Sequence, residues 1–102
     1  VELNRAHRGD LIAYLPEIIP YIRQVDLLYH EATFKDADVA RAHETFHSTA
    51  KEAATIARDA EVKRLLIGHY SARYEDPLPL KQEAVKIFPE TTLAKEGMKI
   101  NL

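Results

Sequence analysis

The chain has 102 residues, 46% of them hydrophobic and 29% charged, which is the size of one globular domain or of a piece of a larger one. Fourteen Lys and Arg against sixteen Asp and Glu give a formal net charge of -2. This balance excludes a broad basic surface for nucleic acid and leaves only local contacts with a polyanion. The absence of cysteine excludes disulfides and thiolate metal sites, so His and carboxylate groups are the remaining ligands for a transition metal.

Neither a membrane span nor a signal peptide is visible in the sequence. No apolar run approaches the ~20 residues that a transmembrane helix needs. We therefore expect a soluble, cytoplasmic chain without membrane contacts. The sequence starts at Val1 without a Met, which favours a fragment of a longer protein.

The first half of the chain predicts a loop, two helices and one strand. Residues 1–10 show no clear period and indicate a loop or an edge segment. Apolar residues at helical spacing begin at Leu15, and Pro20 either kinks this helix or marks its effective start. The run 26–30 predicts a buried strand that ends at His30 and Glu31, and the polar segment 36–45 predicts a short helix.

The second half predicts two helices and two strands. Thr49 and Glu52 have the spacing of a capping box at the start of a helix that runs to about Ala60, and the alanines of this helix favour close packing on a sheet. The segment 62–68 predicts a second buried strand that ends at His69. Asp76 and Pro77 are suited to start a further helix, and the tail predicts a short strand at 92–94 and a turn at 96–97.

Strands that alternate with helices predict an α/β layer with at least partly parallel pairing. Polar residues gather where these elements end, at 30–33, 47–49 and 68–74. In open α/β sheets such strand ends and helix starts hold ligands. Each group also has an ordinary structural interpretation: a cap for Thr49, an exposed loop carboxylate for Glu31, a surface ion pair with Glu75 or Asp76 for Arg73, and packing for Tyr70 and Tyr74.

Four blocks of the sequence, in order, resemble the C-terminal part of ribonuclease Z, a zinc-dependent tRNA 3′ endonuclease of the metallo-β-lactamase superfamily. The blocks are Val-Asp-Leu-Leu-Tyr-His-Glu-Ala-Thr-Phe at 25–34, His-Ser-Thr-Ala at 47–50, Gly-His-Tyr-Ser-Ala-Arg-Tyr at 68–74, and Ile-Phe-Pro-Glu-Thr-Thr-Leu-Ala-Lys-Glu-Gly-Met at 87–98. The resemblance extends from about Tyr14 to Leu102. It implies the C-terminal part of an αββα sandwich, with residues 1–102 as one α/β unit of a larger domain whose N-terminal half is missing.

The resemblance also implies a role for individual residues. His69 is similar to the family's late zinc ligand, and Arg73 to the arginine that contacts the scissile or product phosphate. His47 is similar to the histidine that meets the phosphate and protonates the leaving oxygen, and Glu31 would orient it. Supporting roles are implied for His30, Thr49 and Ser71. The implied reaction is hydrolysis of a phosphodiester in precursor tRNA by a hydroxide held between two zinc ions.

Two of the family's metal-binding motifs do not occur in this sequence. The His-x-His-x-Asp-His motif is absent from the 102 residues. Where the family has Ser-Asp-Thr, only Asp10 offers a nearby acid, and it is carried over as a candidate metal ligand. We therefore expect the chain alone to be inactive and to dimerise, swap elements or expose apolar surface. The alternatives are a non-enzymatic α/β interaction module and another hydrolase of the metallo-β-lactamase fold.

Overall fold

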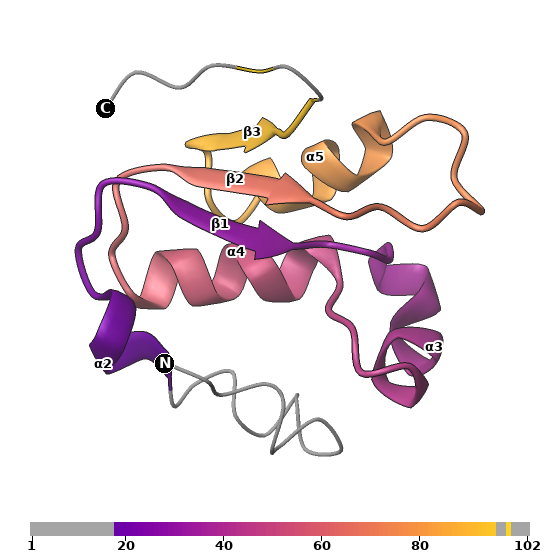
Figure 1. Cartoon of the computed structure of the whole chain (residues 1–102), viewed down its shortest axis with the longest axis horizontal. Coiled ribbons are helices and arrows are strands. Elements are labelled where there is room, and N and C mark those ends of the chain that lie inside the picture. The colour runs from indigo at the N-terminus through magenta and orange to yellow at the C-terminus, as the bar shows by residue number, and fades with distance from the viewer. Residues whose placement is uncertain (1–17, 96–97, 99–102) are drawn as a thin grey trace.

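A three-stranded parallel sheet forms the centre of the structure, a computed structural model that describes residues 18–95 and 98. The strands are β1 (Leu28–Glu31), β2 (Leu65–Gly68) and β3 (Thr91–Leu93), in the order β1-β2-β3. Leu28 pairs with Leu65, and Leu65 with Thr91. All the pairings are parallel, so the carboxyl ends of the three strands lie at one edge of the sheet (Figure 1).

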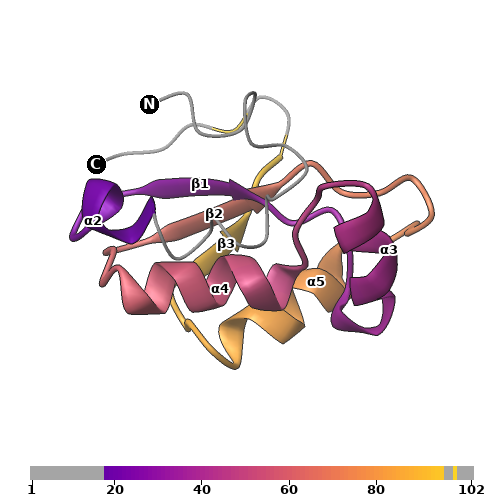
Figure 2. The same ribbon diagram turned by 90° about the horizontal axis from the view of Figure 1, so that it is seen from below.

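Helices α4 (Ala50–Asp59) and α5 (Leu78–Val85) cover one face of the sheet (Figure 2). The alanines at 50, 53, 54 and 57 of α4 are fully buried, because their small side chains let the helix lie close to β1 and β2. Leu65 and Ile67 of β2 face this helix layer and are also fully buried. The sequence prediction that this alanine face packs on a sheet is confirmed.

The short helices lie at opposite ends of the sheet. Helix α2 (Ile19–Ile22) lies near the start of β1, whereas the 3-10 turn η3 (Asp36–Asp38) and helix α3 (Val39–Glu44) lie beyond its carboxyl end (Figure 1). Helix α2 contains Pro20 in its first turn, where a missing N–H costs no helical hydrogen bond. Pro20 therefore marks the effective start of this helix.

Several predicted boundaries were wrong by a few residues. β1 is Leu28–Glu31 rather than 26–30, β2 starts at Leu65 rather than at 62, and β3 is Thr91–Leu93 rather than 92–94. The segment 36–45 divides into η3 and α3. Pro77, rather than Asp76, occupies the cap position of α5, although the Asp76 carboxylate still accepts a hydrogen bond of 2.9 Å from Leu78 N. The start of the predicted first helix, residues 1–10 and the turn at 96–97 lie outside the described residues.

Some large apolar side chains are exposed on the described part of the chain. Tyr29 of β1 is 55% exposed, and its ring lies over Gly68, where an added Cβ would collide with Tyr29 Oη. Tyr21, Phe46, Leu78 and Met98 are the others. The expectation that the chain dimerises, swaps elements or exposes apolar surface stays a prediction. Within the described ranges, no helix is long and apolar enough to span a membrane.

Candidate active site

Three segments meet at the carboxyl end of β1, and residues Ala32–Phe34 form the middle one. On one side, Phe34 forms a parallel bridge with Thr49, and Ala50 N donates to Phe34 O at 3.0 Å. On the other side, Ala32 N donates to Gly68 O at 2.8 Å, and Ser71 N donates to Thr33 O at 2.9 Å. The turn before α4 and the loop after β2 are thus held on opposite sides of the same extended segment.

Helix α4 starts with the capping box that the sequence predicted. Glu52 N donates to Thr49 Oγ1 at 3.1 Å, and Thr49 N donates to Glu52 Oε1 at 2.9 Å. Thr49 is therefore a helix cap, and it fixes the backbone directly after His47 and Ser48. His43 of α3 also contacts Glu52, with 2.9 Å between Nε2 and Oε2, which ties α3 to the same helix end.

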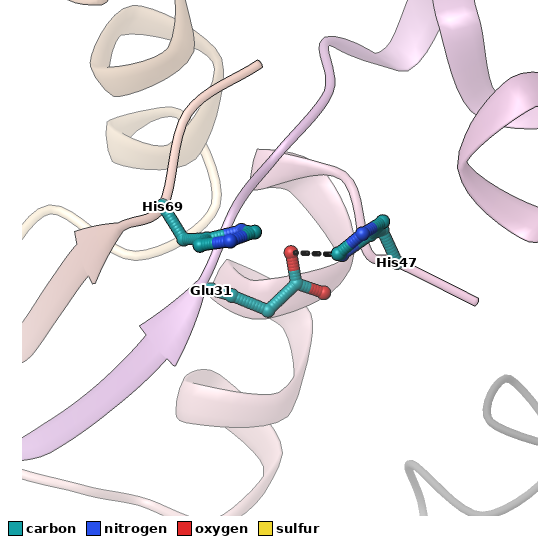
Figure 3. Close-up of side chains that lie close together, drawn as sticks. All are labelled: Glu31, His47 and His69. Atoms are coloured by element: carbon teal, nitrogen blue, oxygen red, sulfur yellow. Dashed lines mark ion pairs between the residues drawn. The ribbon is translucent and has the colours of Figure 1, made fainter. Parts of the chain in front are cut away.

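Glu31 is held by hydrogen bonds to both of its carboxylate oxygens. Ser48 N donates to Oε1, while Thr33 N and Thr33 Oγ1 donate to Oε2 at 3.1 Å and 2.5 Å. His47 Nδ1 lies 3.5 Å from Oε2, and Figure 3 shows the carboxylate between the rings of His47 and His69. Because N–H and O–H donors hold the carboxylate on several sides, its orientation towards His47 is fixed.

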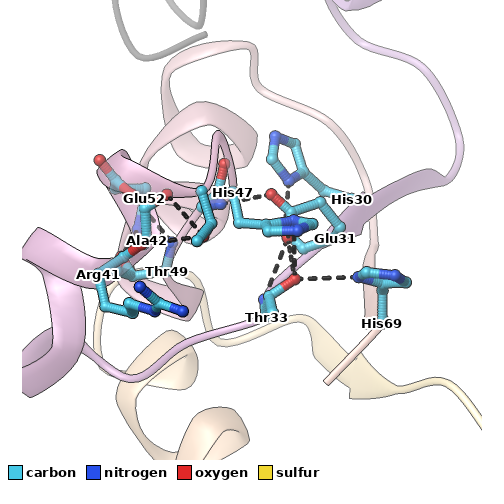
Figure 4. Close-up of polar contacts among 11 residues, drawn as sticks. His30, Glu31, Thr33, Arg41, Ala42, His47, Thr49, Glu52 and His69 are labelled. Atoms are coloured by element: carbon cyan, nitrogen blue, oxygen red, sulfur yellow. Dashed lines mark hydrogen bonds and ion pairs between the residues drawn. The ribbon is translucent and has the colours of Figure 1, made fainter. Parts of the chain in front are cut away.

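The hydroxyl of Thr33 links Glu31 to both histidines (Figure 4). Thr33 Oγ1 lies 3.3 Å from His47 Nδ1 and 3.0 Å from His69 Nδ1. A hydroxyl has one proton, and Thr33 donates it to Glu31, so each contact with a histidine requires an Nδ1–H donor. In this hydrogen-bond assignment, Nε2 of both rings is left without a proton and can serve as an acceptor or a metal ligand.

The two histidine rings stack on each other, with centroids 5.3 Å apart and planes inclined by 27°. Left-handed backbone produces this approach: φ is 60° at Phe46, directly before His47, and also 60° at His69 itself. This conformation costs about 1–2 kcal/mol at a residue other than glycine. Such strain is concentrated at functional sites, where the surrounding contacts enforce it.

Glu31, His47 and His69 could together hold a metal ion. Each offers one ligand atom, and these atoms all lie within 4.8 Å of one another. Imidazole nitrogen and carboxylate oxygen are both ligands that divalent transition metals accept in proteins. The donor chemistry therefore fits a metal, and His69 fits best because it is exposed and its Nε2 is free in the assignment above.

Arg73 occupies a different position from the one that the surface-pair interpretation predicted. Its Nη1 lies 3.4 Å from Asp38 Oδ1, and its guanidinium carbon lies 5.3 Å from the centre of the Phe34 ring. Within the described residues, the ion pair of Arg73 is with Asp38 and not with Glu75 or Asp76, so that interpretation had the wrong partner. Phe34 in turn lies 6.2 Å from the His47 ring, ring centre to ring centre, and thus connects Arg73 with the histidines.

The remaining candidates have simpler surroundings. His30 Nδ1 lies 2.7 Å from the Glu31 carbonyl oxygen, which requires a proton on Nδ1. Ser71 forms the turn after β2, where its Oγ accepts from Arg73 N at 3.3 Å. Asp10 lies outside the described residues.

The sequence interpretation gave no role to Thr33 or Asp38. Thr33 is 5% exposed in the structure. In the sequence it is a polar residue between two apolar neighbours after a strand, and this pattern is the signal that could have identified it. Asp38 lies in the polar segment 36–45, for which the sequence predicted only a short helix. Its contacts with Arg73 and Tyr74, in the loop after β2, cannot be predicted from neighbouring residues.

Comparison with known proteins finds curated relatives that match most of this chain. It is 67% identical over 90 residues to the ribonuclease Z of Parabacteroides distasonis, a match that covers 88% of this chain and 30% of that protein. It is 62% identical over 97 residues to the ribonuclease Z of Phocaeicola vulgatus, covering 95% and 31%. The chain belongs to the ribonuclease Z family. It spans about three tenths of the length of these curated relatives. No family model matches the chain.

Solved structures confirm the predicted metallo-β-lactamase-type fold of this ribonuclease Z segment. Human tRNase Z, short form, matches with a TM-score of 0.65 and 37% identity over 81% of this chain and 27% of that one. The metallo-beta-lactamase fold protein YhfI of Bacillus subtilis matches with a TM-score of 0.74 and 29% identity, over 80% and 33%. The α/β class with parallel strands agrees with both.

Proposed function

We propose that this chain is the C-terminal part of an endoribonuclease that hydrolyses the phosphodiester at the 3′ end of precursor tRNA. The observation that carries the proposal is the linked arrangement of Glu31, His47 and His69 around the Thr33 hydroxyl, in a sequence 67% identical to a ribonuclease Z. Residues 1–102 form one α/β unit of the larger domain. The proposed location of the whole enzyme is the cytoplasm, where bacterial precursor tRNA is found, and its proposed assembly is a homodimer.

Glu31 and His47 are proposed as the proton-transfer pair. Because Ser48 N and two groups of Thr33 already donate to its carboxylate, Glu31 is better suited to orient His47 than to bind a metal. Glu31 Oε2 lies 3.5 Å from His47 Nδ1 and would hold the ring in one orientation. His47 would then deliver a proton to the leaving oxygen of the cleaved phosphodiester.

His69 is proposed as the metal ligand of this segment, with Asp10 as a further candidate. Two zinc ions, when bound, would lower the pKa of a water molecule and neutralise the developing charge on the phosphate. Thr33 holds the Nδ1 side of the His69 ring at 3.0 Å, which leaves Nε2 for the metal. Arg73 is proposed to grip the phosphate, whose oxygens match the planar fork of a guanidinium.

The backbone comparison favours a second candidate function, that of another hydrolase of the metallo-β-lactamase fold. The TM-score is higher for YhfI, at 0.74, than for human tRNase Z, at 0.65, whereas the identity is higher for tRNase Z. A TM-score reports the path of the backbone, while identity reports the side chains that carry the chemistry. We therefore prefer the tRNA nuclease to another hydrolase of the same fold, and both to a non-enzymatic interaction module.

Cleavage assays on the full-length protein that contains this chain test the proposal. The expected result is cleavage of precursor tRNA at its 3′ end and poor hydrolysis of a small nitrophenyl phosphodiester, with about two metal ions per chain. His47→Ala should lower the cleavage rate by about 100-fold or more. His43→Ala is the matched control, because His43 lies nearby on α3 and, among the described residues, its side chain pairs with Glu52 rather than with Glu31 or Thr33. Preference for the small ester would favour the second candidate, and an inactive, metal-free protein would refute both.

A further inference from the structure

We propose that Asp38 is a positioning residue that holds the guanidinium of Arg73 in place for a phosphate group. This inference rests on the proposed function, because the phosphate belongs to the RNA substrate. It assigns a role to a carboxylate of η3, beyond the carboxyl end of β1. The role is one of orientation, since Asp38 acts through Arg73 and need not touch the RNA.

Arg73 is a long side chain on a loop, and it is 45% exposed. A free side chain of this kind samples many rotamers, and holding it still for a ligand has an entropic cost. Here the guanidinium lies over the ring of Phe34, which is itself 5% exposed, and one nitrogen contacts Asp38 Oδ1 at 3.4 Å. This contact uses Nη1, so most of the five N–H donors of the fork stay available for phosphate oxygens.

Asp38 is itself held by groups other than Arg73. Tyr74 Oη donates a hydrogen bond to Asp38 Oδ2, the second oxygen of the same carboxylate. The Tyr74 oxygen accepts a hydrogen bond of 3.0 Å from Lys35 N, and the Lys35 ammonium lies 5.3 Å from the centre of the Tyr74 ring. Burial and the bond to Asp38 raise the pKa of Tyr74, which keeps the phenol protonated and able to donate. The carboxylate therefore has a fixed orientation before Arg73 meets it.

The arrangement also allows an opposite role, in which Asp38 competes with phosphate for Arg73. The two roles predict opposite signs for the loss of the carboxylate. A half-exposed ion pair at 3.4 Å contributes little energy in water, so Asp38 is a weak competitor for a phosphate. As a positioning contact it adds to the one that Phe34 makes with the guanidinium, and Tyr74 holds the Asp38 carboxylate in place for it. We therefore expect positioning to dominate.

The test is a double-mutant cycle in the full-length enzyme, with cleavage of precursor tRNA and its equilibrium binding as readouts. Asp38→Ala should raise KM and weaken tRNA binding by about fivefold to tenfold, with kcat within about twofold, since a phosphodiester is already fully charged in the ground state. Asp38→Asn keeps an acceptor oxygen for Arg73 and should lie within about threefold of the wild type. In an Arg73→Ala background, Asp38→Ala should have less than about twofold further effect.

The competing explanations give distinct results. A misfolded fraction would lower kcat and leave KM unchanged, and Asp38→Asn provides a second variant if Asp38→Ala is poorly folded. Tighter tRNA binding by Asp38→Ala, a loss confined to kcat, or an undiminished loss in the Arg73→Ala background would each overturn the inference. If the wild type binds precursor tRNA without cutting it, the proposed function fails and the binding cycle still decides the role of Asp38. If the wild type neither binds nor cuts, both proposals fail.

Discussion

The turn that carries His47 and the loop that carries His69 hold their histidines in different ways. His47 is followed at once by the Thr49 cap of α4, and the backbone N–H beside it donates to the carboxylate that contacts its ring. His69 is exposed, has a left-handed backbone of its own, and contacts Thr33 and the face of His47. One histidine is fixed from several directions, while the other is fixed on one side of its ring.

This difference agrees with the roles proposed for the two residues. A proton donor has to be oriented before the substrate arrives, because substrate binding does not bring a misplaced donor into line with the leaving oxygen. A metal ligand needs only one ring side fixed, since the metal completes its orientation when it binds. The preorganised side of the site is therefore the Glu31–His47 side.

The largest expected effect comes from replacing the carboxylate that orients His47. Glu31→Gln keeps the size of the side chain but replaces an acceptor oxygen with an NH2 group, which cannot accept from Ser48 N or from Thr33. The single-turnover cleavage rate of the full-length enzyme should fall by about 100-fold, while its metal content stays unchanged. Glu44→Gln, on the exposed end of α3, is the matched control. A parallel loss of metal would show that Glu31 is a ligand instead.

Thr33 provides a sharper test, because it is the contact that the two regions share. Thr33→Val has the same shape without the hydroxyl and should lower the cleavage rate by about tenfold, together with weaker metal retention during dialysis against a chelator. Thr33→Ser keeps the hydroxyl and should stay close to the wild type. Equal losses in the two variants would indicate that the methyl group, rather than the hydroxyl, matters at this position.

A smaller effect is expected from the cap that supports only the His47 turn. Thr49→Ala removes the side-chain half of the capping box and should lower the free energy of unfolding by about 1 kcal/mol. In the full-length protein this corresponds to a fall of about 2–4 °C in the melting temperature. Ser48→Ala is the matched control, because the buried Ser48 hydroxyl has no hydrogen-bond partner within the described residues and its backbone N–H is retained. A fall as large in Ser48→Ala would contradict this account.

The sequence predicted the parts of the site that depend on neighbouring residues. Thr49 and Glu52 are three positions apart, so the capping box follows from local spacing, and the strand ends at Glu31 and Gly68 follow from apolar runs. The resemblance to ribonuclease Z supplied roles for His47, His69 and Arg73, and those roles remain proposals. What local patterns left open was how the segments approach each other.

The contacts of Thr33 and Asp38 depend on tertiary geometry. Thr33 meets both histidines because the backbone turns left-handed at Phe46 and at His69. Phe does not signal such a turn, and His is only enriched in it, so the sequence did not predict it. Asp38 meets Arg73 and Tyr74 because the loop after β2 returns across the extension of β1. Local spacing favoured Glu75 or Asp76 as the partner of Arg73, and the packing of the loop determined otherwise.

The smallest expected effect concerns the loop of His69 and depends on pH. Tyr70 Oη donates to Ile67 O at 2.7 Å and to Ala94 O at 3.3 Å, which ties this loop to the ends of β2 and β3. Burial raises the pKa of Tyr70 above its usual value of about 10, so the neutral phenol stabilises the fold. This contribution is complete below about pH 10 and is lost as the pH rises through the raised pKa of the folded state.

Tyr70→Phe should therefore be less stable than the wild type by about 0.5 kcal/mol near neutral pH, because two acceptors lose their donor. The difference should shrink above about pH 10, where the wild type loses the stabilisation that the variant never had. Melting temperatures of the full-length protein at pH 8 and pH 11 measure it, with Tyr21→Phe, which removes a hydroxyl from an exposed ring, as the control. A difference that grows with pH would mean that the ionised phenol is the better partner in the folded loop, and that the His69 side is held less firmly than its hydrogen bonds indicate.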